Sequence, residues 1–265
     1  MKLFVICTLV ASAYSLPLDA LDSRIFNGRQ ATLGQFPWQA LLYTLFYDSS
    51  GMFCGGSLIH TRWVLTAAHC LDSNSRVGFR ATHVSMWFGI IDMIDIANPR
   101  AVFRNSSEYY IYDDFNHINL LNDIALVKLN EIVLNTENIR PILLGNRLYA
   151  RSHVKVAGFG RTQEGSFNTK LHYARLKTIG NKKCRKVYQY YASIRQVCAI
   201  SKSESTCYGD SGSPLVRQKS NGVWKQFGVC SSRQTNVCEL GKGLVVFSRI
   251  RDYRSWIEDK IEAHE

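Results

Sequence analysis

The sequence predicts an all-β protein, either a barrel or a sandwich. Short stretches of strand-like composition are separated by turns along most of the 265 residues, which is typical of these folds. A convincing helical pattern is found only near the C-terminus. With 46% hydrophobic and 12% aromatic residues, the chain can fill a substantial core, which excludes a disordered protein.

Seven segments are predicted to be strands, and they are residues 38–47, 82–89, 124–129, 154–160, 213–218, 223–229 and 244–250. One helix is expected after Asp252, the predicted N-cap, because apolar residues follow it at helical spacing. These residues are Tyr253, Trp256, Ile257 and Ile261. We expect the helix to serve in packing.

The N-terminus has the pattern of a secretory signal at residues 1–15. Lys2 precedes an apolar run at residues 3–10, and Ala13 and Ser15 are the small residues expected before cleavage after Ser15. The run is too short for a membrane span, which needs roughly 20 apolar residues, and no later segment reaches that length. We therefore expect a secreted, extracellular protein without a membrane span.

The chain carries 32 Lys and Arg against 21 Asp and Glu, a formal net charge of +11. Such a charge favours acidic partners such as anionic glycans, although a spread of solvated lysines is the commoner explanation. The run at residues 182–186, KKCRK, together with Arg249, Arg251 and Arg254, is a candidate patch for sulfated glycans. No nucleic-acid partner is expected.

Secretion changes how the cysteines are interpreted. Cys7 leaves with the signal, so seven cysteines remain, and in an oxidising compartment most should pair and leave one over. No CxxC pair occurs, so neither a structural zinc nor any other metal or cofactor is expected. Residues 228–238, GVCSSRQTNVC, could then be a metal loop, a disulfide loop or a wall of a binding site.

Three segments place chemically versatile residues in unusual surroundings: LTAAHC with His69, NDIALVKL with Asp123, and CYGDSGSPLV with Ser211. Taken alone, a histidine next to a cysteine is more often structural, and an aspartate before an apolar strand is a turn or cap residue. A serine in a glycine-rich turn can be surrounded by backbone N–H groups, but the turn alone proves nothing.

Together, in this order, the three segments resemble those of the trypsin-like (chymotrypsin-fold) serine proteases. The resemblance extends from Ile25 to the C-terminal helix, so residues 25–265 are expected to be one peptidase domain. It implies two packed antiparallel six-stranded β-barrels with a C-terminal helix, a catalytic cleft between the barrels, and a monomer. The phrases QFPWQALL and CGGSLI resemble those of arthropod chymotrypsin-like and elastase-like secreted proteases most closely.

The resemblance implies the catalytic roles. Ser211 would be the nucleophile, His69 the general base and then acid, and Asp123 the buried carboxylate that orients His69. The N–H groups of Gly209 and Ser211 would form the oxyanion hole. Ser231 matches the serine that supports the aspartate and borders the substrate backbone.

The segment DSRIFNG at residues 22–28 resembles an activation site. Cleavage after Arg24 would release the propeptide at residues 16–24, which contains no cysteine to tether it, and would make Ile25 the new N-terminus. In the family this ammonium group enters the protein and pairs with the residue corresponding to Asp210. The protein is therefore expected to be a zymogen with a trypsin-like activating protease as a partner.

The resemblance also implies three disulfides: Cys54–Cys70, Cys184–Cys198 and Cys207–Cys238. Cys230 then remains as a buried free thiol, with an intermolecular bridge as the alternative.

The predicted substrate pocket departs from the trypsin pattern. Trypsin-like enzymes carry an acidic residue six positions before the nucleophile, and this chain has Ser205 there. We therefore expect chymotrypsin-like or elastase-like specificity. Ser232 and Arg233 replace an aromatic residue and a glycine, and Val245 stands where an open pocket has glycine. Ser213, in place of another glycine, should have a modest effect if its backbone is unstrained.

Three consequences of the altered walls remain open. The pocket could accept small aliphatic residues, Arg233 could reach into it and favour an acidic residue, or Arg233 could point to water. Expected partners are protein or peptide substrates and protein protease inhibitors. The alternative function is a protease-like binding protein with little turnover that uses its basic surface. Asn105, in the sequence NSS, is a glycosylation acceptor on a predicted surface loop.

Overall fold

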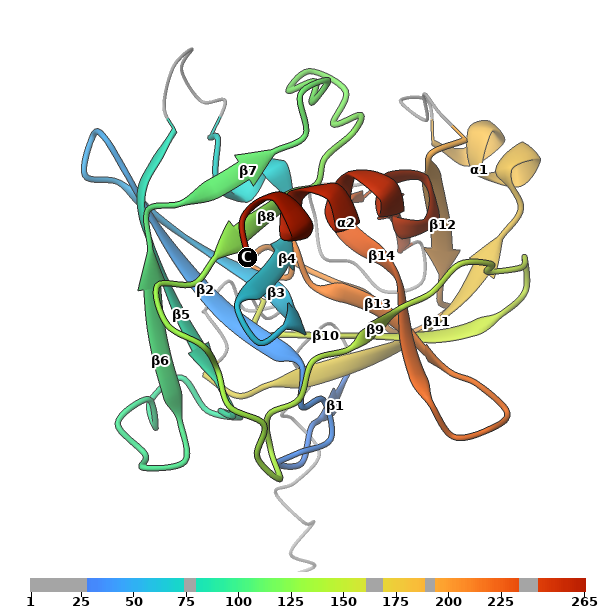
Figure 1. Cartoon of the computed structure of the whole chain (residues 1–265). Helices are drawn as coiled ribbons and strands as arrows, with labels where there is room; N and C mark the ends of the chain where they lie inside the picture. The colour runs from blue at the N-terminus through green and yellow to red at the C-terminus, as the bar shows by residue number, and fades with distance from the viewer. Residues whose placement is uncertain (1–27, 74–79, 161–168, 189–193, 234–242) are drawn as a thin grey trace, which may run out of the picture.

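The computed structural model describes residues 28–73, 80–160, 169–188, 194–233 and 243–265. The predicted signal, the propeptide, Ile25 and Cys238 lie outside these ranges. Within them the chain forms two antiparallel sheets and a C-terminal helix (Figure 1). None of the described helices is long and apolar enough to cross a membrane.

The first sheet occupies most of the N-terminal half. In spatial order its strands are β6 (Val102–Ser106), β5 (Ala81–Phe88), β2 (Gln39–Phe46), β3 (Gly51–His60), β4 (Trp63–Thr66), β8 (Ala125–Lys128) and β7 (Tyr109–Ile111). The edge strands β6 and β7 are consecutive in the chain and separated by residues 107–108 alone. The sheet is a strongly curved half-barrel, and one of its faces holds fully buried residues such as Leu42 and the paired Met86.

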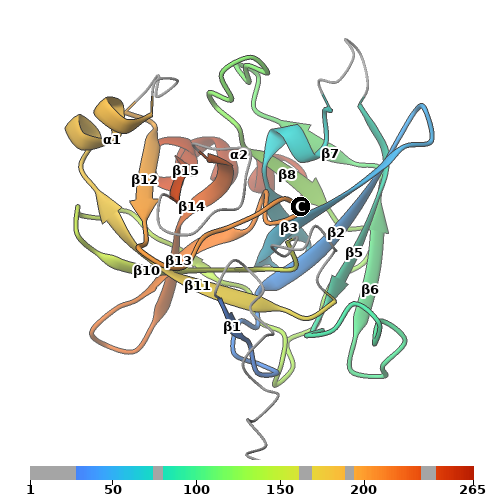
Figure 2. The same cartoon turned by 180° about the vertical axis from the view of Figure 1, so that it is seen from behind.

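The second sheet is a closed barrel. Six strands complete the circle, namely β11 (His172–Ile179), β10 (His153–Gly158), β13 (Pro214–Gln218), β14 (Trp224–Arg233), β15 (Leu244–Arg249) and β12 (Gln196–Ile200), which pairs again with β11. Two short strands join from outside: β1 (Arg29–Gln30) on β11 and β9 (Leu143–Leu144) on β14. The helix α1 (Asn181–Val187) connects β11 to β12, and Figure 2 shows it at the opposite end of the molecule from β6.

The C-terminal helix links the two sheets. A 3₁₀ turn at Ile250–Tyr253 leads from β15 into α2 (Arg254–Ala263). Tyr253 and Ile257 are buried in the core of the first sheet, although the chain arrives there from the second barrel. Burial of this apolar face stabilises the contact between the two halves.

Several predictions about the fold are confirmed and some are wrong. The all-β class, the C-terminal helix and all seven predicted strands are present, but the first sheet is a half-barrel and not a closed six-stranded one. Asp252 is not the N-cap of α2: it lies within the 3₁₀ turn, and no side chain caps the helix. Its carboxylate is instead 3.3 Å from Nε of Arg251.

The sequence reading missed strand β3 because of its glycines. A Cβ on Gly55 would lie 2.0 Å from Oγ of Ser213, and one on Gly56 would lie 2.8 Å from a methyl group of Leu42. Gly55 allows the two halves of the protein to approach closely, and Gly56 leaves room for Leu42 within the first sheet, so both glycines serve packing and do not mark a turn.

Replacing Ile257 by alanine should lower the free energy of unfolding by about 2–5 kcal/mol, because its fully buried side chain joins α2 to the first sheet. Urea unfolding measures the change. Ile261→Ala is the matched control, since Ile261 lies one turn further along and is only partly buried. An equal loss in both variants would contradict the packing role assigned to Ile257.

Candidate active site

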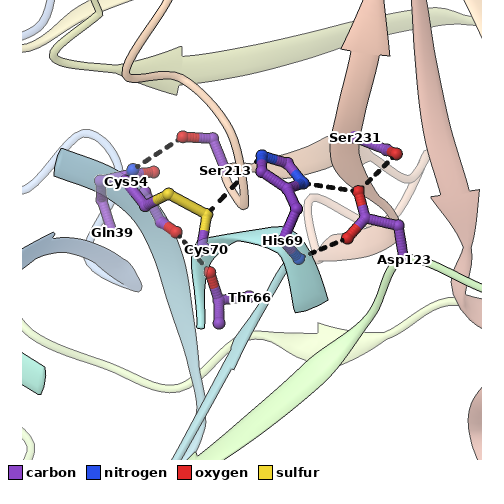
Figure 3. Close-up of a disulfide and its surroundings, with 9 residues drawn as sticks. Gln39, Cys54, Thr66, His69, Cys70, Asp123, Ser213 and Ser231 are labelled. Carbon is purple, nitrogen blue, oxygen red and sulfur yellow. Dashed lines mark hydrogen bonds and ion pairs between the residues drawn. A yellow bond between two sulfur atoms is a disulfide. The ribbon is translucent and has the colours of Figure 1, made fainter. Parts of the chain in front are cut away.

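His69 is held by a short rigid turn between the two sheets. Strand β4 ends at Thr66, and the 3₁₀ turn Ala68–Cys70 follows at once. The disulfide Cys54–Cys70 ties this turn to β3, with the two Cα atoms 6.2 Å apart. Figure 3 shows His69 between this disulfide and Asp123. The backbone around His69 is therefore fixed by strand pairing on one side and a covalent bond on the other.

A chain of hydrogen bonds runs through Asp123. Nδ1 of His69 lies 2.7 Å from Oδ2 of Asp123, and the backbone N–H of His69 donates to Oδ1 at 2.9 Å. Oγ of Ser231 donates to Oδ2 at 2.6 Å from the other side (Figure 3). Asp123 is fully buried, whereas the side chain of His69 is 20% exposed. A proton on Nδ1 satisfies the carboxylate and leaves Nε2 as a proton acceptor.

The two partners shift each other's pKa in opposite directions. Burial alone would lower the pKa of His69, but the charge of Asp123 and their hydrogen bond outweigh it and raise that pKa above 6.5. Burial alone would raise the pKa of Asp123, but His69 and Ser231 together hold it below its ordinary value. Asp123 therefore stays ionised, and its charge stabilises the protonated form of His69.

Asn122 positions Asp123, and the sequence reading did not identify it. Its φ of 57° is in the left-handed region, which asparagine tolerates better than most residues. Its Oδ1 accepts from the hydroxyl of Tyr253 at 3.0 Å and from Arg195 at 3.2 Å, and its Nδ2 donates to the carbonyl of Asp114 at 2.9 Å. An asparagine directly before the aspartate is the one sequence signal of this role.

The loop with Ser211 packs against the loop with His69. The N–H of Gly55 donates to the carbonyl of Ser211 at 2.7 Å. Gly212 has φ 81°, and a Cβ there would lie 2.2 Å from the carbonyl oxygen of Gly55 and 2.3 Å from Oγ1 of Thr66. Ser211 and His69, both in described ranges, share no hydrogen bond in this structure. Such bonds often form only when substrate is bound.

Two backbone amides, those of Gly209 and of Ser211 itself, have no acceptor among the described residues. Gly209 has φ 95°, a conformation suited to glycine. The two N–H groups are the donors that the sequence predicted for an oxyanion.

Asp210 stands between Gly209 and Ser211 in the sequence, and its side chain is fully buried. Its Oδ1 accepts from the N–H of Gly160 at 2.9 Å and its Oδ2 from the N–H of Cys207 at 2.7 Å. Burial raises the pKa of Asp210 to about 6, and the two hydrogen bonds and the charge of Arg233 oppose this only in part. A buried carboxylate with such a pKa is well placed to gain from a cationic partner.

Ser213 fits its position without backbone strain, since it is not among the described residues with positive φ. Its buried Oγ accepts from Nε2 of Gln39 at 3.4 Å (Figure 3). The serine therefore has a polar partner in the core, in line with the modest effect expected for it.

Ser205 lies in a tightly packed environment, and within the described part of the chain its hydroxyl bonds to no carboxylate. It is buried, and a Cβ on the neighbouring Gly243 would lie 2.5 Å from its Oγ. Glu204 precedes it, but Oε1 of Glu204 accepts from Nε and Nη2 of Arg175 at 3.2 and 3.0 Å. The nearest acidic side chain in sequence is thus engaged elsewhere, a pairing that the sequence reading missed.

Arg233 and Val245 face each other across strands β14 and β15. The Val245 side chain is fully buried in the core of the second barrel with Cys230 and Phe247. The Arg233 side chain does not point away into water, because its Nη1 donates to the carbonyl of Thr206 at 3.2 Å.

Two other residues near Arg233 complete this side of the site. The guanidinium of Arg233 lies 4.8 Å from the centre of the Tyr208 ring. Oγ of Ser232 lies 3.1 Å from the hydroxyl of Tyr188. Ser232 is therefore bonded to the segment that follows α1.

Two of the expected disulfides, Cys54–Cys70 and Cys184–Cys198, are present. Cys207 is also disulfide-bonded, while its expected partner Cys238 lies outside the described residues. Cys230 is free and buried, and burial raises the pKa of its thiol well above the ordinary value.

The described residues contain one close cluster of potential metal ligands, formed by Cys54, His69 and Cys70. Because the two cysteines form a disulfide, they offer no thiolate to a metal ion.

Two surface predictions have different outcomes. Asn105 lies on the edge strand β6 and not on a loop, so its predicted loop position is wrong, while its glycosylation stays a prediction. Its Oδ1 accepts from Asn130 at 2.9 Å. On α1 the basic residues Lys182, Lys183, Arg185 and Lys186 are all exposed, while Cys184 is buried.

Replacing Asn122 by valine should lower the free energy of unfolding by about 3 kcal/mol or more, because valine strains the backbone and leaves the partners of Asn122 unsatisfied. Asn122→Gly keeps the backbone conformation and loses the hydrogen bonds alone, so its loss should be smaller. Thermal and urea unfolding measure both variants. Equal losses would show that the left-handed backbone is not the constraint.

Comparison with known proteins agrees with this geometry. Residues 25–257 match the trypsin family. Rat chymotrypsin-C is 32% identical, over 91% of this chain and 90% of its own length, and human chymotrypsin-like elastase family member 3B is 32% identical over 96% and 95%. The solved structure of HL collagenase is similar with a TM-score of 0.78 and 31% identity, over 89% of this chain and 98% of its own. The chain belongs to the trypsin family and is a serine endopeptidase with the chymotrypsin fold.

Proposed function

We propose that this protein is a secreted endopeptidase, made as a zymogen, that hydrolyses peptide bonds through Ser211, His69 and Asp123. The observation that carries the proposal is the buried chain of hydrogen bonds from Ser231 through Asp123 to His69, beside the Ser211 loop. Serine is a weak nucleophile at neutral pH and needs an adjacent base. The hydrogen bond from Nδ1 of His69 to Asp123 supports the tautomer in which Nε2 can act as that base.

The reaction follows from the positions of these groups. Nε2 of His69 accepts the hydroxyl proton of Ser211 while Oγ bonds to the substrate carbonyl carbon, and the carbonyl oxygen becomes an oxyanion. The N–H groups of Gly209 and Ser211 stabilise that charge, each by about 3 kcal/mol. His69 then gives its proton to the leaving amine as the peptide bond breaks. Water then gives a proton to His69 and bonds to the carbonyl carbon of the acyl-enzyme. His69 passes that proton to Oγ of Ser211 as the ester bond breaks, which releases the acid product and restores Ser211.

Activation depends on Asp210. It stands between Gly209 and Ser211 in the sequence, its carboxylate is fully buried against the N–H groups of Gly160 and Cys207, and burial raises its pKa to about 6. An ammonium group at Ile25, formed by cleavage after Arg24, would offset this cost and fix the loop that carries Gly209. The activating enzyme would be a trypsin-like protease, because the bond follows an arginine.

The surroundings of Ser205 argue against cleavage after Lys or Arg. The hydroxyl of Ser205 donates to the carbonyl of Thr206 at 3.3 Å, and the carboxylate of Glu204 pairs with Arg175. Among the residues that the structure describes, a positively charged substrate side chain would find no free carboxylate at Ser205. Specificity of the chymotrypsin or elastase type, which needs no carboxylate at this position, is consistent with the observed residues.

A binding protein that kept the fold and lost turnover is the competing function. The exposed basic residues of α1 would then bind anionic glycans or a protein partner. Reaction of Ser211 with an electrophile separates the two functions, because a binding protein does not require an activated nucleophile.

After cleavage behind Arg24, a fluorophosphonate probe should label Ser211 stoichiometrically, because His69 activates its hydroxyl. Mass spectrometry of the labelled peptide identifies the site. Ser211→Ala should not react, and Arg24→Gln should stay unreactive because it cannot be activated. A correctly cleaved, folded protein that does not react would refute the proposed protease activity.

The pH dependence of kcat/KM should show a rise with a midpoint above 6.5. Activity requires neutral His69, and Asp123 raises the pKa of that imidazole, so the active form appears only above the raised value. Asp123→Asn should shift the midpoint downwards and reduce kcat by about 10⁴-fold, the loss known for this change in other enzymes with the same triad. An unchanged midpoint in Asp123→Asn would contradict the assigned role of Asp123.

A further inference from the structure

The second barrel carries an apolar face on its outside as well as a core within. Along a strand, successive side chains point to opposite faces, and β12 and β15 place their residues in two separate clusters. Val197 and Ala199 lie in the barrel core, whereas Ile200 packs with Leu244 in a cluster beside α1. Ile179 of β11 and Ile200 are half-buried there, so part of this apolar face stays open to solvent.

A cavity of about 620 Å³ lies on this outer face. Ile179, Ile200 and Leu244 line it as an apolar floor, and residues of α1 line it from one side. The disulfide Cys184–Cys198 ties α1 to β12, and α1 lies beside β12 in both views of the molecule (Figures 1 and 2). The volume is in the range of roughly 300–1,000 Å³ that is typical of small-molecule sites. The fold therefore provides a cavity with a covalently held wall.

Three lysines form a basic rim around the apolar floor. In the sheet, Lys177 of β11 pairs with Ile200 of β12, so both side chains leave the same face. Lys183 lines the cavity from α1, and Lys202 lines it from the segment that follows β12. All three lysines are exposed, and none of them forms an ion pair within the part of the chain that the structure describes.

The positive character of the rim comes from several elements. Arg175 also lines the cavity, but its Nη2 lies 3.0 Å from Oε1 of Glu204, which neutralises its charge. None of the described residues that line the cavity is acidic. Because the three lysines reach the rim from β11, from α1 and from the segment after β12, the charge of the rim does not depend on a single side chain.

The apolar floor and the basic rim together select one kind of ligand. A sulfated glycan would pair with the lysines but leave the floor unused. A neutral apolar molecule would cover the floor but leave the lysines without a counter-charge. A molecule with one alkyl chain and one carboxylate uses both, because its chain removes apolar surface from water and its carboxylate pairs with an ammonium group at the rim.

We propose that this cavity binds the anion of a long-chain fatty acid, with the alkyl chain on the apolar floor and the carboxylate at the lysines of the rim. The site goes beyond the proposed protease function, and no residue of the catalytic triad lines it. Binding therefore requires neither turnover nor cleavage after Arg24.

Displacement of a fluorescent fatty acid tests the proposal. A dansylated undecanoic acid should bind the purified protein saturably, at one molecule per chain, and dodecanoate should displace it. The methyl ester of dodecanoate has the same alkyl chain without the charge, and it should displace the probe about tenfold less well. Absence of saturable binding, or equal displacement by acid and ester, would overturn the proposal. Displacement by a heparin fragment but not by dodecanoate would identify a glycan site and overturn it as well.

Variants separate the cavity from the general positive charge of α1. Lys177→Gln/Lys183→Gln should weaken the binding of dodecanoate by about fivefold. Lys182→Gln/Lys186→Gln removes the same charge from exposed residues of α1 that do not line the cavity. This matched control should bind dodecanoate like the unaltered protein. Equal weakening in both variants would show that the fatty acid follows net charge, and would exclude the cavity as its site.

A series of chain lengths tests the apolar floor. Each methylene group that enters the cavity should tighten binding by up to about fourfold, so affinity should rise from octanoate to decanoate to dodecanoate. Ile200→Asp should abolish binding because it places a like charge on the floor, and thermal unfolding shows whether this variant is folded. Binding that does not depend on chain length in the unaltered protein would contradict the proposal, whether or not Ile200→Asp folds.

Discussion

The interaction on which the rest of this structure depends is the set of hydrogen bonds that the protein donates to one buried carboxylate. Asp123 is fully removed from water, which is costly for a charge unless the protein supplies donors. The donors come from the backbone and side chain of His69 and from Ser231. His69 follows the first sheet and Ser231 lies in the second, so this requirement brings the two halves of the molecule together at one point.

Other elements serve the same carboxylate from further away. Ser248 on β15 donates to the backbone carbonyl of Asp123 at 2.7 Å, and Tyr253, just before α2, bonds to Asn122. The C-terminal helix is thus held in position by a polar contact at Tyr253 as well as by apolar packing. A second charged group lies in the site. Arg233 places its cation between strand β14 and the segment with Thr206 and Tyr208, close enough to the buried Asp210 to lower its pKa. The charge of Arg233 thus offsets part of the cost of burying this carboxylate.

The sequence predicted the site better than the surrounding framework. TAAHC, NDIAL and GDSGS, taken together and in this order, resemble the motifs of a known family, and that resemblance identified His69 and Asp123, which the structure joins by a hydrogen bond. The half-barrel could not be predicted, because the break at residues 107–108 depends on how β6 and β7 pair with distant strands. The Arg175–Glu204 pair and the contacts of Asn122 were missed for the same reason: each joins residues far apart in the chain. For Arg233 the sequence left the direction of the side chain open, and the bond to Thr206 fixes one, because a side-chain direction depends on its partners.

The most direct test of this account is the protonation state of His69, measured by ¹⁵N NMR of its imidazole. The account predicts a proton on Nδ1 and a bare Nε2 at neutral pH, with a titration midpoint above 6.5 because the charge of Asp123 outweighs burial. A proton on Nε2, or a midpoint below 6.5, would show that Asp123 does not control this histidine and would contradict the central claim.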